Sequence, residues 1–272
     1  MPHHPVLTRN QLLALVALTI MWGVNWPMMK LSLRELSPLY FRAITMTLGA
    51  SWLFVFFRLK GIRMWPEGAE WRTVATLALP NMLGWHTISI FGLKELSSGR
   101  ASILGFTMPI FTVLIGAAFF GERITPRVRL AVACVSVAIG LLLWHELQRL
   151  SGRPAGVVWM LGAAACWALG TLMFRRAHLT LSPLVVTVWM LLLGSVVVWA
   201  LALSLEPLPQ PASFTPMMWV SLAYGVLINY GFAQLIWFGM ARDLPPATSA
   251  MPVTASPTTC EICGVTPMFW QS

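Results

Sequence analysis

Two arginines and a histidine interrupt segments of the sequence that are otherwise almost entirely apolar. An arginine at the centre of a membrane helix costs about 2.5–3.5 kcal/mol on insertion scales, so Arg42, His86 and Arg100 need polar partners or water. Guanidinium groups suit carboxylates and phosphates, which makes Arg42 and Arg100 candidates for attracting such a group. The alternative is that both extend to lipid head groups or pair with Glu35 and Glu95.

His86 is a side chain at depth whose ordinary pKa, about 6.5, lies near neutrality. The apolar segments contain no Asp or Glu in their interiors, so a proton relay built from carboxylates is not predicted. If the protein couples its work to protons, His86 is the candidate carrier. The alternative is a neutral histidine that hydrogen-bonds to a neighbouring helix.

Aromatic rings and side-chain amides also occur within the apolar segments. A cavity lined by such groups suits organic molecules that have flat or apolar parts and one or two polar groups. Helix packing is the alternative explanation for each of them. With the three residues above, the candidate substrate-binding residues are Trp22, Asn25, Arg42, Trp85, His86, Arg100, Trp167, Tyr224, Asn229, Tyr230 and Gln234.

Signatures of catalysis and of cofactor binding are missing from the sequence. It contains no G-x-S-x-G, H-E-x-x-H or P-loop motif, and a membrane-embedded enzyme would need clustered acid–base or nucleophilic groups. Cys260 and Cys263 form a single CxxC pair, which we interpret as chance. We therefore predict no catalytic residue, no metal site, no cofactor and no enzymatic activity.

The composition indicates which elements hold these residues. Hydrophobic residues make up 57% of the 272 positions and charged residues only 10%, whereas a soluble domain is about a quarter charged. The apolar residues form long blocks, so we predict an all-α integral membrane protein. The net charge of +9 comes from short loops, where it orients spans, and does not indicate a nucleic-acid partner.

Eight blocks are long enough to be spans, and they are predicted at about 11–30, 38–58, 72–92, 99–120, 127–145, 155–174, 183–204 and 216–239. A ninth candidate begins near Leu244. Pro109 lies halfway along the fourth span, which predicts a helix that is interrupted within the membrane. Lys and Arg are more numerous in the loops on the side of the N-terminus. This favours a multi-pass protein of the inner or plasma membrane with a cytoplasmic N-terminus.

The sequence repeats itself at a constant offset. Trp22, the triplet at 36–38 and Gly49 recur 145 positions later as Trp167, the triplet at 181–183 and Gly194. We predict a first five-helix repeat at 1–150 and a second at 151–272. An odd number of spans per repeat makes the two copies face opposite ways, and a substrate site is then expected where they meet.

The second copy departs from the first after about residue 250. The residue that corresponds to Pro109 is Pro257, but the surrounding sequence is rich in Pro and Thr and contains no apolar run that spans a bilayer. The expectation is therefore a degenerate or truncated second repeat, with about eight to nine spans of the ten that two repeats would give.

Several short motifs resemble those of the drug/metabolite transporter superfamily in its EamA-like branch, which has two inverted five-helix repeats. They are 22–25 (WGVN), Ser37-Pro38 with Arg42, Pro109, and 120–122 (FGE). The resemblance implies ten spans, cytoplasmic termini, and export or exchange of small metabolites such as amino acids or drugs.

The predicted function is therefore a secondary transporter, an exporter or exchanger that works by alternating access. Its partners would be the lipid bilayer, a small-molecule substrate and, if transport is proton-coupled, protons. The alternatives are an inactive truncated remnant or a regulatory membrane protein, and less favourably a membrane-embedded enzyme.

Overall fold

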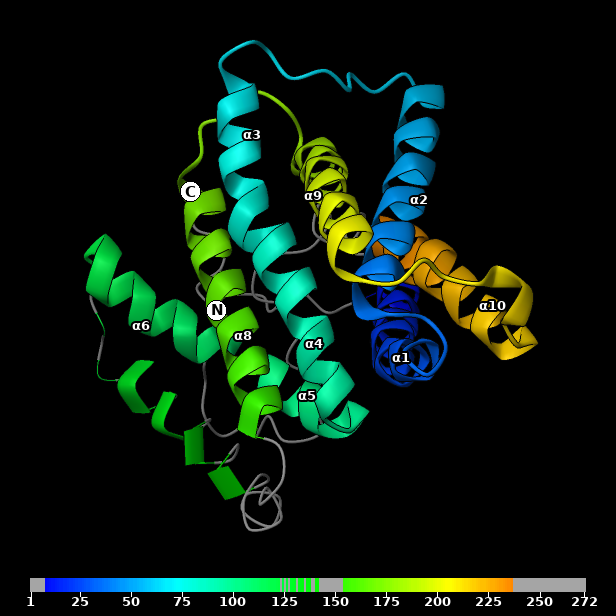
Figure 1. The fold of residues 1–272 in the computed structure, drawn as a ribbon. Coiled ribbons are helices and arrows are strands. Elements are labelled where there is room, and N and C mark those ends of the chain that lie inside the picture. The colour runs from blue at the N-terminus through cyan, green and yellow to red at the C-terminus, as the bar shows by residue number, and fades with distance from the viewer. Residues whose placement is uncertain are drawn as a thin grey trace.

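The computed structural model describes residues 8–122 and 154–236, together with residues 124, 126, 128–130, 132–134, 136, 137, 140 and 141. Helices and short loops account for these residues, and no strand occurs among them. Figure 1 shows the helices gathered into one bundle. The predicted all-α fold is confirmed.

The first half of the chain supplies α1 (Arg9–Ser32), α2 (Pro38–Leu59), α5 (Ser98–Gly105) and α6 (Met108–Phe120). Between α2 and α5, a single continuous helix is made of α3 (Glu70–Ala78), the π-helical η1 (Leu79–Thr87) and α4 (Ile88–Glu95). In the second half, α8 (Pro154–Arg176) and α9 (Pro183–Leu205) are followed by a short turn, η2 (Pro211–Ser213). The last described span contains α10 (Pro216–Ala223) and the π-helical η3 (Tyr224–Phe232), and it continues as helix to Ile236.

Six helical segments of the described chain are long and apolar enough to cross a membrane. The helix at 70–95 is not among these six, because polar residues such as Asn81 and His86 lower its hydropathy. Seven predicted spans are therefore helical where expected. The span predicted at 127–145 is described only in part, and the segment from Leu244 onward lies outside the described residues.

Several helices begin at a proline that follows a serine or threonine. Three spans begin with a proline at the first helical position, directly after Ser37, Ser182 or Thr215. A proline costs nothing there because the missing N–H would have no intrahelical acceptor, and a preceding Ser or Thr is a favoured N-cap. This explains why the Leu-Ser-Pro triplet recurs at the start of α2 and α9.

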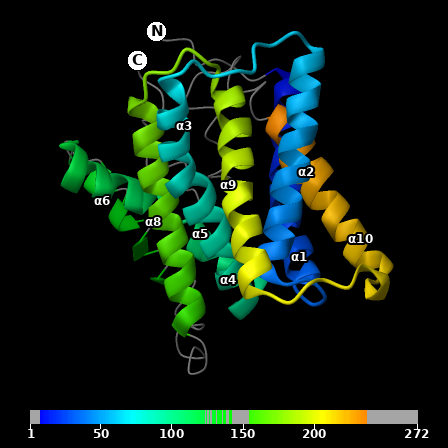
Figure 2. The ribbon, with the colours of Figure 1, turned by 45° about the horizontal axis from the view of Figure 1, so that its top comes forward.

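The fourth span is interrupted, as Pro109 predicts. α5 ends at Gly105 and α6 begins at Met108, with Pro109 in its first turn. At the break, the Thr107 hydroxyl and the Thr107 backbone N–H both donate to the Leu104 carbonyl oxygen, at 2.6 and 3.1 Å. Figures 1 and 2 show α6 bending away from the line of α8 after the break.

The centre of the bundle is the packed pair α2 and α9, which start 145 positions apart (Figure 2). Gly49 of α2 packs against Tyr230 of η3, while Gly194 of α9 packs against Met82 of η1. Each central helix thus uses the equivalent glycine to contact the π-helical segment of the opposite half.

The bundle has two ends, which Figure 2 displays as lower and upper. The lower end carries the loops at 33–37 and 206–215, and the upper end carries the loops at 60–69 and 177–182.

Candidate functional site

Arg42, His86 and Tyr230 meet in the interior of the bundle. Arg42 Nε donates to the backbone oxygen of His86 at 2.9 Å, and Nη2 lies 3.3 Å from Ser89 Oγ. The hydroxyl of Tyr230 is 3.0 Å from His86 Nδ1. Because α2, η1 and α4 belong to the first half and η3 to the second, this cluster joins the two halves of the chain.

The π-helical segments place two members of this cluster. η1 and η3 each have nine residues, and they start 145 positions apart, at Leu79 and Tyr224. A π-helix is rare and is found frequently at functional sites, since it re-aims side chains and loosens the backbone hydrogen-bond ladder. Here it presents His86 and Tyr230 to each other across the interface.

Arg42 is a buried cation whose polar contacts are neutral. Its exposed fraction is 4%, and its acceptors are a backbone oxygen and a hydroxyl. No carboxylate of the described residues forms an ion pair with it. Glu35, the predicted alternative partner, instead accepts hydrogen bonds from Thr215. The site therefore carries a positive charge in a medium where a lone charge is costly.

Trp85 of the π-helical η1 forms an aromatic pair with Trp167 of α8. The rings of Trp85 and Trp167 are 5.5 Å apart and nearly edge to face, at 61°. A Cβ atom at Gly105, the last residue of α5, would lie within 3.4 Å of both Trp26 and Trp85. The end of α5, where the fourth span is interrupted, therefore packs closely against the rings of Trp26 and Trp85.

The remaining candidates lie apart from the cluster. Asn25 donates to the sulfur of Met29 on its own helix, at 3.6 Å, and the Tyr224 hydroxyl donates to the Met21 backbone oxygen at 2.7 Å. Arg100 is half-buried in the first turn of α5. The last candidates, all half-buried on α1 or on the span at 216–236, are Trp22, Asn229 and Gln234.

Ser89 is a member of the cluster that sequence reasoning missed. It follows His86 by three positions, and residues three apart share a helix face. This three-residue spacing is the sequence signal that could have identified Ser89 as a neighbour of His86.

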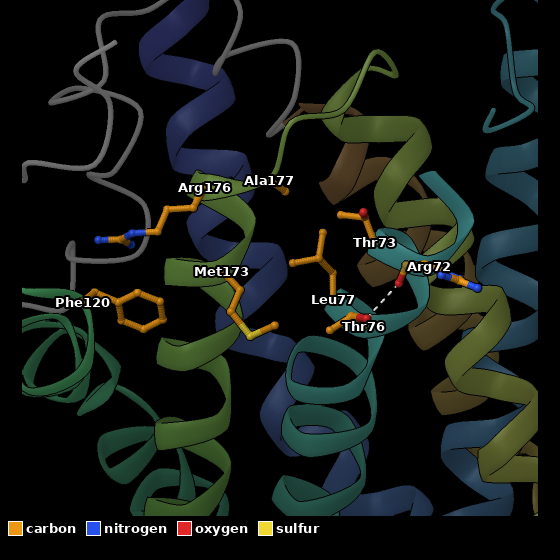
Figure 3. Close-up of a pocket in the computed structure, with 8 residues that line it drawn as sticks. All are labelled: Arg72, Thr73, Thr76, Leu77, Phe120, Met173, Arg176 and Ala177. Carbon is orange, nitrogen blue, oxygen red and sulfur yellow. Dashed lines mark hydrogen bonds between the residues drawn. The ribbon is translucent and has the colours of Figure 1, made fainter. Parts of the chain in front are cut away.

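A separate cavity of about 370 Å³ opens near the upper end, between α3, α6 and α8 (Figure 3). Arg176 stacks over the Phe120 ring at 4.3 Å and donates to Glu122 at 2.7 Å. Figure 3 shows Arg72 and Arg176 pointing away from each other, so they do not converge on one ligand. None of the predicted site residues lines this cavity, whose walls are Arg72, Thr73, Thr76, Leu77, Phe120, Met173, Arg176 and Ala177.

Comparison with known proteins identifies the family that has this architecture. The model of the EamA-like transporter family matches residues 10–144 and again residues 154–266. The chain belongs to the EamA-like transporter family. It is a multi-pass membrane protein and a membrane transporter, and the family match points away from an enzyme.

Curated relatives cover nearly the whole chain. The uncharacterized transporter YvbV of Bacillus subtilis is 28% identical over 90% of this chain and 81% of its own length. The uncharacterized inner membrane transporter YedA of Escherichia coli K12 is 23% identical over 92% of this chain and 80% of its own. A crystal structure with 18% identity superposes with a TM-score of 0.60, covering 90% of this chain and 82% of the solved one, which supports the fold.

Proposed function

We propose that this EamA-family chain is a secondary transporter of small organic metabolites, and that its substrate binds between the two halves at Arg42, His86 and Tyr230. The observation that carries the proposal is the buried Arg42 cation, whose contacts with the described residues are all neutral, at the point where the halves meet. Inverted-repeat transporters bind their substrates at such an interface and expose the site alternately to the two sides.

Arg42 would bind an anionic group of the substrate, and a carboxylate fits it better than a phosphate dianion. A carboxylate can accept two parallel hydrogen bonds from a guanidinium and neutralises its single charge. A dianion would leave one negative charge in the low-dielectric interior, which is costly. Amino acids and other organic acids are therefore the proposed substrate class.

His86, Tyr230 and the aromatic pair would contact the rest of the substrate. His86 and Tyr230 offer a ring nitrogen and a hydroxyl that exchange one hydrogen bond with each other and can exchange others with a ligand. The Trp85–Trp167 pair would contact flat or apolar parts of the substrate. If transport is proton-coupled, His86 is the proposed carrier.

Uptake and efflux assays on Arg42→Gln test the proposal. Cells that express the chain would first be screened for resistance to, and uptake of, amino acids and organic acids. We expect R42Q to lower the transport rate of the active compound at least tenfold at equal expression, because the ligand anion loses its counter-charge. The matched control is R100Q, which removes a half-buried arginine outside the cluster and should retain most of the rate. A wild-type rate for R42Q would remove Arg42 from the site.

A further inference from the structure

Two glutamates of the first half bind two threonines of the second half in the same way. At the lower end of the bundle, Glu35 accepts hydrogen bonds from the backbone nitrogen of Thr215 at 2.7 Å and from its hydroxyl at 2.6 Å. At the upper end, Glu70 accepts from the backbone nitrogen of Thr180 at 2.6 Å and from its hydroxyl at 2.9 Å. We call these contacts the lower clasp and the upper clasp.

The two clasps are equivalent under the repeat offset. Thr180 lies 145 positions after Glu35, and Thr215 lies 145 positions after Glu70. The operation that maps the first half onto the second therefore maps each clasp onto the other, with donor and acceptor exchanged. It also moves the contact from one end of the bundle to the opposite end, as expected for inverted copies (Figure 2).

Other contacts between the halves lack this property. Glu206 accepts from the backbone nitrogens of Leu39 and Tyr40 at the lower end, but the residue 145 positions before it is Gly61, which has no side chain to do the same. Glu122 binds Arg176 at the upper end, but the residue 145 positions before Arg176 is Leu31, which has no charge to do the same. Among the described contacts, the clasps are the pair that occurs once at each end.

We propose that the lower and upper clasps are the two alternating closures of the transport pathway, one opening while the other holds. The inference rests on the proposed alternating-access function. Both clasps are closed in this structure, and the Arg42 cluster lies between them in the interior of the bundle.

The chemistry of the clasps suits a closure that has to open repeatedly. A carboxylate that accepts from an N–H and an O–H makes charge-assisted hydrogen bonds, which are stronger than neutral ones. Thr180, Thr215 and Glu35 are nevertheless exposed, so water can replace each partner once a clasp opens. Glu70 is buried at 8% exposure and also accepts from the Glu67 backbone nitrogen at 2.8 Å, so the upper clasp should be the firmer of the two.

Thiol labelling from each side of the membrane tests the proposal. Ser89 contacts Arg42 and is 1% exposed, so Ser89→Cys, in a chain whose native cysteines are replaced by serine, reports when the interior opens. A membrane-impermeant methanethiosulfonate reagent would be applied to intact cells and to inverted vesicles. The variants are Glu35→Gln and Glu70→Gln, because glutamine keeps one oxygen but loses the charge.

We expect E35Q to raise the labelling rate at least threefold from one side of the membrane and E70Q to raise it at least threefold from the opposite side. Glu67→Gln is the matched control, because it removes a carboxylate that pairs with Arg63 and keeps the backbone N–H that donates to Glu70. This variant should leave both rates unchanged. Thr180→Val provides a second route to the upper clasp and should resemble E70Q, whereas Thr180→Ser should resemble the unsubstituted chain. Equal shifts from the same side, or unchanged rates in folded E35Q and E70Q proteins, would overturn the proposal.

The labelling experiment needs no substrate, so the two proposals fail separately. Opposed shifts in a chain that transports none of the organic acids tested would support the clasps and contradict the proposed substrate class. Intact transport with unchanged labelling in both variants would contradict the clasps and leave the proposed function standing.

Discussion

Arg42 holds its place through two different nitrogens, which an ammonium group could not reproduce. Nε faces the backbone oxygen of His86 and Nη2 faces Ser89, so the planar guanidinium spans one turn of the neighbouring helix. The fixed orientation leaves the charge available at the interface between the halves. The guanidinium group of Arg42 therefore serves the site through its geometry as well as through its charge.

Glu35 illustrates how hydrogen bonds set the behaviour of a single carboxyl group. The hydroxyl of Thr215, and then its backbone N–H, lower the pKa of Glu35 below its ordinary value of 4.5. A lowered pKa in the folded state means that the stabilisation is fully present above 4.5 and is lost as the pH falls through the folded-state pKa.

We therefore predict a pH-dependent difference in thermal stability between the parent protein and E35Q. The gap between their unfolding temperatures should be constant from about pH 5.5 to 7.5 and should shrink as the pH is lowered below about 4.5, because only the parent can bind the extra proton. Thermal unfolding of both proteins in the same detergent across this pH range measures the difference in unfolding temperature. A gap that widens on acidification would contradict the assignment.

At the scale of helices, close packing at two equivalent glycines connects the centre of the bundle to the site. A Cβ at Gly49 would overlap the Cβ of Tyr230, and a Cβ at Gly194 would lie 2.8 Å from that of Met82. Neither contact can be relieved by rotating the end of a flexible side chain. The central helices therefore fix the positions of η1 and η3.

We predict that Gly49→Ala and Gly194→Ala each destabilise the protein by about 1–3 kcal/mol, the usual cost of an added methyl group in a packed core. Gly23→Ala is the matched control, because Gly23 is also helical and nothing lies within 4 Å of the added Cβ. It should be neutral or stabilising by about 0.5–1 kcal/mol, since alanine favours helices. Unfolding midpoints in the same detergent decide the matter, and equal stability of all three variants would show that the packing is looser than described.

Apolar blocks and punctuating prolines were sufficient to predict most of the helices. The spans follow from the length of the uncharged runs, and the break between α5 and α6 follows from Pro109. The π-helical segments could not be predicted in the same way. A π-helical turn contains one more residue than an α-helical turn, but the apolar segment that holds it has the same length and hydropathy in either case.

The same extra residue explains why the site was predicted only in part. Arg42 and His86 stood out because a polar group in an apolar run is costly. Tyr230 could not be separated from Asn229 and Gln234, because a π-helical turn rotates the faces that a regular helix would present. The meeting of all three side chains depends on contacts between segments that are far apart in the sequence.

At the scale of the whole molecule, the two ends differ in how their basic side chains are used. Lys30, at the lower end, donates to the backbone oxygens of Leu93 and Lys94 at 2.7 Å each, where a cation offsets the negative end of a helix dipole. Its charge therefore has a structural role. The upper end, where α1 begins, has the greater number of exposed basic side chains among the described residues, and we propose that it is cytoplasmic.

We predict that reporters inserted into the two ends will show opposite locations. Alkaline phosphatase, which is active only outside the cytoplasm, should be active when fused after Gln210 of the lower end and inactive when fused after Met64 of the upper end. A cytoplasmic fluorescent reporter at the same sites should give the reverse pattern. Phosphatase activity at Met64 alone would place the N-terminus outside.

The arrangement of the clasps also determines which halves can pair. Both carboxylates belong to the first half and both threonines to the second. Two copies of the first half, meeting in the same inverted manner, would bring a glutamate against a glutamate at each end, and the charges would repel. Two copies of the second half would meet with only threonines there. These four side chains therefore favour an inverted pairing of unlike halves over self-association, whether the halves share a chain or come from two.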